Sequence, residues 1–218
     1  MWTVDLDGIE IGVVGMAVGA PFAVLVAELL TASGAELILS ITSAGQISAV
    51  DELPCFVLIE KALRDEGTSL HYQPPGRWSR LDDNLQRRLA AAFTHLPEPV
   101  WPGSSWTTDA PYRETACAIE AAKQDNVACV EMEAAGLYAY ATARGQAVVC
   151  FAHITNTMAT TGADFEKGAD NGATRRSGCR SRRRWCSPVT IQAAASQGTN
   201  SAPDQPRRTT AGAGTPTR

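Results

Sequence analysis

The sequence contains no uninterrupted run of about 18 apolar residues, the length that a membrane-spanning helix needs. Its first ten residues also lack the basic segment followed by an apolar one that is typical of a secretory leader. These two absences predict a cytoplasmic protein without a membrane partner. Of the 218 residues, 44% are apolar, which is enough to bury the core of one full-sized domain.

Paired or regularly spaced cysteines are also missing. The six cysteines include no CxxC pair, and several lie in apolar segments where a reduced thiol packs like a small hydrophobic side chain. No metal-spaced cluster and no Ser, His and Asp set stands out. The sequence therefore predicts neither disulfides nor a metal site.

Acidic residues are nearly absent from the C-terminal part of the chain. Residues 175–218 carry 9 Arg and one Asp, whereas residues 1–174 carry 10 Lys and Arg against 22 Asp and Glu. The C-terminal part has almost no apolar periodicity, so we expect an incomplete α/β domain over residues 1–174 and a disordered Arg/Pro/Thr-rich tail over 175–218. A basic tail suits nucleic acid, but this composition favours a frameshifted end after about Ala173, and nucleic acid is not the expected partner.

Apolar periodicity alternates between strands and helices. Residues 9–14 predict a buried strand, residues 22–32 a helix ended by Gly34, and residues 35–41 the next strand. The same order recurs over residues 127–155, with a helix from Glu133 to Arg144 that Gly145 stops. Each strand–helix–strand unit predicts two parallel strands joined by a right-handed crossover, which indicates an α/β sheet covered by helices.

Between these units the pattern is less regular. Residues 78–96 alternate as one amphipathic helix expected to cover the sheet. Residues 97–115 are rich in Pro, Gly, Ser and Thr, which predicts an ordered loop leading into a helix near residues 112–123.

Ligands of open α/β sheets bind at the carboxyl ends of the strands. This places the segment with Glu131 and Glu133 near the one with Thr155 and Asn156, and gives a pocket with carboxylates, hydroxyls and an amide. Each residue alone also has a structural interpretation. Glu133 would interact favourably with the helix dipole, Met132 would be a core residue, and Asn156 would be a turn or cap residue.

Five segments, taken together, resemble the nucleoside phosphorylase superfamily of the purine and uridine phosphorylase type. They are GVVGMAVGAP, TSAGQI, TTDAPYRET, VEMEAAGLYAYA and ITNTM, and the similarity covers about residues 9–170. The resemblance implies a three-layer αβα sandwich with a central mixed, partly barrel-like sheet. It also implies a homo-oligomer that cleaves a ribonucleoside with inorganic phosphate, without a cofactor, to give base and pentose 1-phosphate.

The resemblance also assigns roles to residues. Glu133 would accept hydrogen bonds from the ribose hydroxyls, Met132 would pack under the sugar, and Glu131 would contact the sugar or brace the loop. Asn156, with Thr155, would meet the base, and Tyr112 would form an aromatic wall. An amide at Asn156 suits a 6-oxopurine, because it donates a hydrogen bond but delivers no proton. Catalysis would rest on Glu133 and Asn156.

The residues that would bind phosphate depart from the family pattern. Ser43 and Gly45 match the phosphate-binding motif, but Ser40 stands where the family has an arginine. The family's earlier glycine- and arginine-bearing loop would precede Met1, which suggests an N-terminal truncation. Three alternatives to phosphorolysis therefore stay open: a nucleosidase in which water attacks, a non-catalytic nucleoside-binding remnant, and a nucleic-acid binder acting through the tail.

Overall fold

The structure is a computed structural model that describes residues 1–90, 92–93, 99–157 and 190–195. Its strands are β1 (Trp2–Leu6), β2 (Ile9–Gly15), β3 (Ala35–Gln46), β4 (Cys55–Asp65), β5 (Trp78–Arg80), β6 (Val100–Thr108), β7 (Cys129–Glu131), β8 (Ala147–Thr157) and β9 (Thr190–Ala195). Its helices are α1 (Ala20–Ala32), α2 (Asp83–Leu89), α3 (Ala116–Gln124) and α4 (Ala134–Arg144), with short 3₁₀ turns η1 (Ser69–His71) and η2 (Pro111–Arg113).

Five of the strands close into a ring in the order β3, β7, β6, β4 and β8, because β8 pairs with both β3 and β4. Neighbours are parallel at β3–β8, β4–β6 and β6–β7, and antiparallel at β3–β7 and β4–β8. Strands β9, β2 and β1 extend the sheet beyond β3, and β5 adds to β4. The mixed, partly barrel-like sheet expected from the sequence is therefore confirmed.

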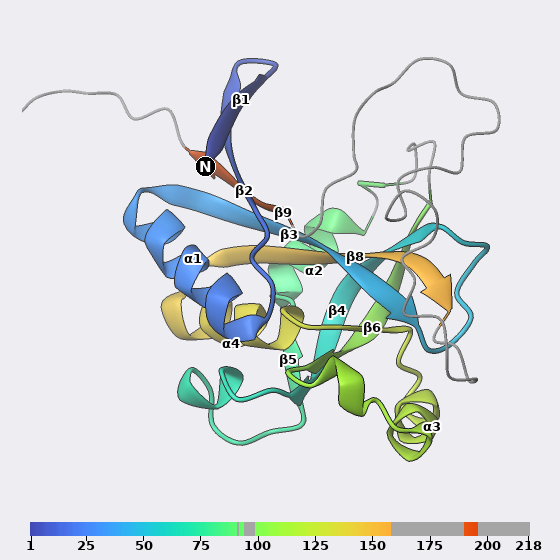
Figure 1. Cartoon of the computed structure of the whole chain (residues 1–218). Helices are drawn as coiled ribbons and strands as arrows, with labels where there is room; N and C mark the ends of the chain where they lie inside the picture. The colour runs from blue at the N-terminus through green and yellow to red at the C-terminus, as the bar shows by residue number, and fades with distance from the viewer. Residues whose placement is uncertain (91, 94–98, 158–189, 196–218) are drawn as a thin grey trace, which may run out of the picture.

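The first strand–helix–strand unit has the predicted direction but not the predicted burial. Strands β2 and β3 are both antiparallel to β9, which lies between them, so they are parallel to each other. Strand β2 is exposed or half-buried, because it lies near the open edge of the sheet and pairs outward only with β1. Figure 1 shows this β1–β2 hairpin extending away from the body of the molecule. Strand β9 falls within the stretch expected to be disordered; the rest of that tail lies outside the described residues.

The second unit differs from the prediction in direction. Strand β7 is antiparallel to β3, whereas β8 is parallel to β3, so β7 and β8 run in opposite directions. The predicted parallel crossover between these two strands is therefore wrong. Strand β7 has only three residues and inserts between β6 and β3 in the ring, where it runs parallel to β6. Helix α4 then carries the chain to the other side of β3.

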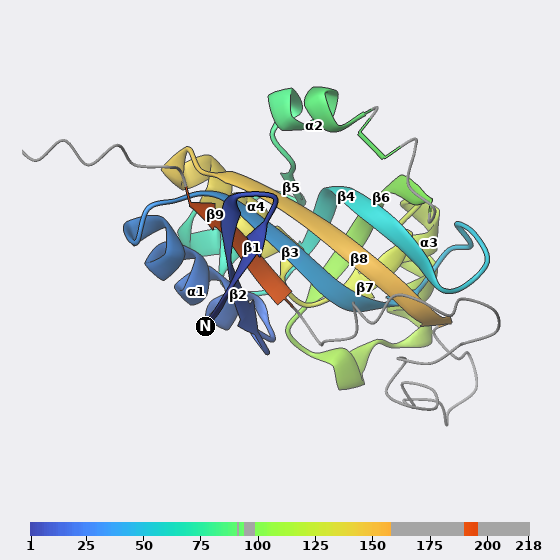
Figure 2. The same ribbon diagram turned by 90° about the horizontal axis from the view of Figure 1, so that it is seen from above.

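Helices α1 and α4 lie side by side against one side of the sheet (Figure 1), and Figure 2 shows α2 set apart from the sheet, beyond β5. The two helices pack closely at Gly136, where a Cβ atom would lie 2.8 Å from Cβ of Ala20. Helix α4 ends at Gly145, which has a left-handed backbone with φ of 65°. Both its extent and its stop match the sequence-based prediction, and the central mixed sheet flanked by helices is confirmed.

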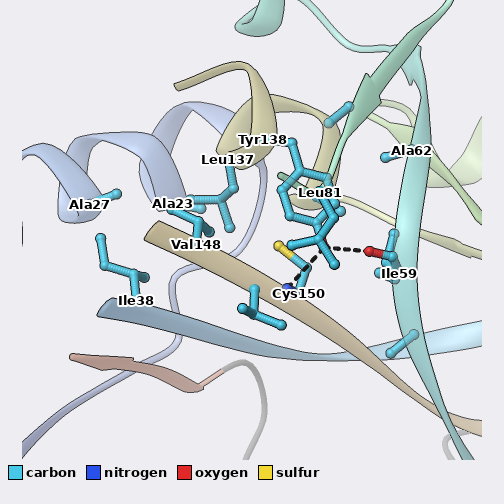
Figure 3. Packing of buried hydrophobic residues seen from close by; sticks show 14 of the residues in the cluster. Ala23, Ala27, Ile38, Ile59, Ala62, Leu81, Leu137, Tyr138, Val148 and Cys150 are labelled. Atoms are coloured by element: carbon cyan, nitrogen blue, oxygen red, sulfur yellow. Dashed lines mark hydrogen bonds between the residues drawn. The ribbon is translucent and has the colours of Figure 1, made fainter. Parts of the chain in front are cut away.

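Tyr138 fastens α4 to the strands beneath it, as Figure 3 shows. Its ring is fully buried, its hydroxyl donates to the carbonyl oxygen of Ile59 in β4, and it accepts from the amide of Cys150 in β8 at 3.0 Å. A buried hydroxyl with both a donor and an acceptor partner costs little to bury. These two hydrogen bonds therefore fix α4 against β4 and β8.

Two segments between these units differ from the prediction. The helix expected over residues 78–96 is divided into β5 and the short α2, which begins after Asp82 caps the amides of Asn84 and Leu85. The expected loop over residues 97–115 contains β6, which pairs with β4 and β7 despite Pro102 and Gly103. Pairing on both sides outweighs local composition there, and η2 with α3 follow near the predicted helix.

Candidate active site

The segments that carry the predicted glutamates, Asn156 and the phosphate-binding residues meet at the carboxyl end of β3. Gly45 pairs with Val130 of β7 on one side and with Asn156 of β8 on the other. Since neighbouring strands are about 4.8 Å apart, the two flanking strands lie about 10 Å from each other here. The expected meeting of the Glu131–Glu133 and Thr155–Asn156 segments therefore occurs, although β3 between them brings it about rather than a parallel crossover.

Glu133 lies at the N-terminus of α4 with its carboxylate buried, and the residue is only 1% exposed. One carboxylate oxygen accepts a hydrogen bond from the amide of Gly19 at 2.7 Å, and the other accepts from the hydroxyl of Thr42 at 2.7 Å. Its side chain does not cap α4. The helix-dipole interpretation of Glu133 is therefore incomplete, because its partners come from the residue before α1 and from β3.

Gly19 presents its amide to Glu133 because of its backbone conformation. It precedes α1 with φ of 85° and ψ of 146°, values that residues with a Cβ atom rarely adopt. Pro21 follows near the first helical position, where its missing N–H leaves no hydrogen bond unmade. The glycine and proline of this segment thus have a defined use: they turn the chain so that one N–H points at the carboxylate.

Glu131 rather than Glu133 caps α4. One of its carboxylate oxygens accepts from the amides of Glu133 and Ala134, both at 2.7 Å. The other accepts from the hydroxyl of Ser105 at 2.9 Å and from the hydroxyl of Thr107. Thr107 in turn accepts from the amide of Ala135 at 2.9 Å. These contacts support the bracing role for Glu131, since each of its oxygens already accepts from two protein donors, whereas each oxygen of Glu133 accepts from one.

Burial dominates the electrostatics of the two glutamates. Loss of water around Glu131 and the neighbouring charge of Glu133 raise the pKa of Glu131 to about 7, although its hydrogen bonds oppose this. Burial also raises the pKa of Glu133, against the hydrogen bonds from Gly19 and Thr42. The site therefore holds two carboxyl groups whose charges are costly, which favours a ligand that donates hydrogen bonds.

The other sequence-predicted residues are more exposed than this pair. Met132 is half-buried between the two glutamates, and Thr155 and Asn156 are half-buried at the end of β8. The hydroxyl of Thr155 contacts Oδ1 of Asn156 at 3.4 Å, which leaves the amide NH₂ group of Asn156 as its donor. Tyr112 lies in η2 and is 85% exposed.

The two residues predicted to hold phosphate lie near the end of β3, Ser43 exposed and Gly45 half-buried. Ser40, at the position of the family's arginine, is 1% exposed, and its hydroxyl has no hydrogen-bond partner among the described residues. The buried side chain at this position is therefore small and neutral.

Two surface hollows lie away from the glutamates. One is lined by Leu58, Gln86 and Trp101, between α2 and the starts of β4 and β6, and the other by Pro21, Tyr72 and Asp109, beside α1. Neither is lined by Glu133, Thr155 or Asn156.

Among the described residues, no group of His, Cys, Asp and Glu could hold a metal ion. None of the described helices has the length and apolar character to cross a membrane.

Four contributors to the site were not identified from the sequence as site residues: Gly19, Thr42, Ser105 and Thr107. Gly19, Thr42 and Thr107 lie inside segments that carry the family resemblance. The sequence therefore identified these segments, but not the amide and the hydroxyls in them that bind the two glutamates. Ser105 and Thr107 become visible only through the pairing of β6 with β7, which was not predicted.

Comparison with known proteins identifies the family of this chain. A family model described as the Phosphorylase superfamily matches residues 1–182. A guanosine phosphorylase from Halorubrum lacusprofundi is 26% identical over 165 residues, which cover 76% of this chain and 67% of that protein.

Among solved structures, an AMP nucleosidase from Bacteroides thetaiotaomicron has the same fold, with a TM-score of 0.55 at 22% identity. The match covers 63% of this chain and 59% of that one, so this chain spans less than two thirds of that structure. Since the family match covers most of the sequence and the fold agrees, the chain belongs to the phosphorylase superfamily.

Proposed function

We propose that this chain cleaves the N-glycosidic bond of a ribonucleoside, preferably a purine nucleoside, with inorganic phosphate as the attacking group and no cofactor. The observation that carries the proposal is the buried carboxylate of Glu133, held by two hydrogen-bond donors at 2.7 Å. Membership of the phosphorylase superfamily supports the reaction class, and the match to a guanosine phosphorylase supports the nucleoside.

Breaking this bond gives the sugar an oxocarbenium-like character, so the site must hold the ribose firmly and stabilise positive charge. The 2′- and 3′-hydroxyls of ribose offer two donors, the same number that Gly19 and Thr42 supply to Glu133. Each carboxylate oxygen has a second lone pair, so the hydroxyls can join or replace these donors. Met132 then packs under the sugar, and Glu133 places a negative charge near the developing positive one.

The preference for purines rests on Asn156 and Thr115. The NH₂ group of Asn156 can donate to N7 or O6 of a 6-oxopurine as the base leaves, and Thr155 orients the amide. Tyr112 provides an aromatic face for the base. The resemblance places Thr115 and Cys117 where uridine-cleaving relatives read the base with a Gln and an Arg, and this difference argues against uridine. The hydroxyl of Thr115 accepts from the amide of Ala118 and caps α3.

Phosphate would bind at Ser43 and Gly45, at the end of β3. A second candidate reaction, hydrolysis by water, is favoured by one observation: Ser40 is a buried neutral residue where the family motif has arginine. Each charge-assisted hydrogen bond that a phosphate loses weakens its binding by about 1.5–3 kcal/mol. The fold shared with an AMP nucleosidase is compatible with this alternative.

The test is turnover of inosine, guanosine, adenosine and uridine, each with and without inorganic phosphate, followed by analysis of base and sugar products. We expect base release from inosine or guanosine that depends on phosphate and yields ribose 1-phosphate. Free ribose without phosphate would instead establish a nucleosidase. Nucleoside binding without turnover would identify a non-catalytic remnant.

We also propose that the chain forms a homo-oligomer through the outer face of α1. Phe22, Leu25 and Leu29 follow a spacing of three and four residues along α1, Val18 lies just before the helix, and all four are 46–61% exposed. The stripe carries no charge, so a second copy can pack against it without burying an ion.

The corresponding prediction concerns Leu25. The Leu25→Asp variant should elute as a smaller species than the wild type in size-exclusion chromatography with light scattering. A matched control is Leu70→Asp, which changes an equally exposed leucine outside α1. A wild type that is already monomeric, or an unchanged mass for Leu25→Asp, would contradict this interface.

A further inference from the structure

We propose that Thr107 is a positioning residue for the sugar-binding carboxylate: through its own contacts and through Glu131 it fixes the first turn of α4, and thereby Glu133. The inference rests on the proposed function, because it assumes that Glu133 holds the ribose. No sequence motif assigned a role to Thr107 or to its neighbour Ser105.

The first step of the argument is the account of the amides that begin α4. The first amides of a helix have no partner within the helix and must find one elsewhere. Here the amides of Glu133 and Ala134 donate to Glu131, and the amide of Ala135 donates to Thr107. Three consecutive amides are therefore satisfied by side chains from two neighbouring strands.

The second step is the support of Glu131 itself. Its remaining oxygen accepts from Thr107 and Ser105, which are two residues apart on β6 and so point to the same side of that strand. The register pairs Thr107 with Glu131 and Ser105 with Cys129, so the hydroxyls stand next to the carboxylate. Thr107 is fully buried and Glu131 is 3% exposed, which shields these bonds from water.

The third step is the link to the sugar site. The side chain of Thr107 donates a hydrogen bond to Glu131 and also accepts one from the amide of Ala135 in α4. Ser105, by contrast, contacts only Glu131 of these two partners. The amide held by Glu131 belongs to Glu133, whose carboxylate reaches Gly19 and Thr42. A hydroxyl on β6 thereby sets the place of a carboxylate that it does not touch.

The test compares Thr107→Val, which keeps the shape but removes the hydroxyl, with Thr107→Ser, which keeps the hydroxyl. The matched control is Thr108→Val, since Thr108 is 2% exposed on the same strand but its hydroxyl serves Ala110 rather than α4. Two readouts are used: kcat and KM for the preferred nucleoside, and amide hydrogen exchange of the segment 129–137.

We expect Thr107→Val to lower kcat/KM by about 10- to 100-fold, because a carboxylate displaced by a fraction of an ångström loses its alignment. Exchange at the start of α4 should become faster in the same variant. Thr107→Ser and Thr108→Val should stay within about threefold of wild type and keep the exchange protection. If Thr107→Val does not fold, Ser105→Ala removes a single bond to Glu131 and should show a smaller loss of the same kind.

Unchanged exchange and kinetics in a folded Thr107→Val or Ser105→Ala variant would overturn the inference. So would a Thr107→Ser variant that is as impaired as Thr107→Val. If the wild type cleaves no nucleoside, the proposed function fails, whereas the exchange measurement still decides whether Thr107 orders the start of α4.

Discussion

Glu133→Gln is expected to lower kcat/KM for the preferred ribonucleoside by about 10²- to 10³-fold while the fold is retained. In the proposed function the carboxylate accepts from the ribose hydroxyls and places a negative charge near the developing oxocarbenium, and the amide loses both properties. A charge-assisted hydrogen bond contributes about 1.5–3 kcal/mol, so loss of one or two accounts for this range. Both kcat and kcat/KM should fall, since the charge matters most in the transition state.

The fold should persist because glutamine keeps one oxygen to accept from Gly19 or Thr42 and removes a charge that is costly to bury. A matched control is Glu36→Gln, an exposed position about 20 Å away along β3 from Thr42. Steady-state kinetics and the unfolding midpoint of both variants check the prediction. Equal activity of Glu133→Gln and Glu36→Gln would contradict the role of Glu133.

The free energy of unfolding is expected to fall as pH rises from about 5 to about 8. Burial and the charge of Glu133 raise the pKa of Glu131 to about 7, from the model-peptide value of 4.5. The folded chain therefore binds this proton more tightly than the unfolded chain in that interval, so deprotonation favours unfolding. The raised pKa of the buried Glu133 acts in the same direction, as does the pKa of Glu114, which desolvation raises to about 7.

Glu131 alone should account for a decrease of roughly 2–3 kcal/mol over this interval. Urea unfolding at pH 5, 6, 7 and 8 measures it, and Glu131→Gln should flatten the profile while Glu36→Gln leaves it unchanged. The hydrogen bond and ion pair with Arg144 lower the pKa of Glu28. Protonation of Glu28 therefore changes the stability only at a pH below this range. An unfolding free energy that rises with pH, or a Glu131→Gln profile as steep as wild type, would contradict this assignment.

Local signals in the sequence were sufficient where structure depends on local chemistry. The helix from Glu133 to Arg144 and its stop at Gly145 follow from apolar spacing and from the left-handed backbone that glycine tolerates. The convergence of the Glu131 and Asn156 segments also followed from the sequence. What periodicity could not supply was the direction of β7, because a three-residue strand carries no information about which neighbours it joins.

Sequence periodicity also could not predict that the two glutamates have different roles. Glu131 and Glu133 are two residues apart, and the sequence marks both as acids next to a helix. The structure separates them through partners on other elements: Ser105 and Thr107 on β6 hold Glu131, whereas Gly19 and Thr42 hold Glu133. Proline and glycine in β6 concealed that strand, although Gly103 is needed because a Cβ there would lie 2.9 Å from Val57.

The most direct test of the central claim, that Glu133 holds the ribose hydroxyls, is a cycle that pairs Glu133→Gln with the 2′,3′-dideoxy analogue of the preferred nucleoside. In wild type, loss of the hydroxyls should lower kcat/KM by about 10²- to 10³-fold. In Glu133→Gln, the same change of substrate should cost less than about tenfold, because the partner is already gone. Equal losses in the two enzymes would show that the hydroxyls bind elsewhere and would contradict the account.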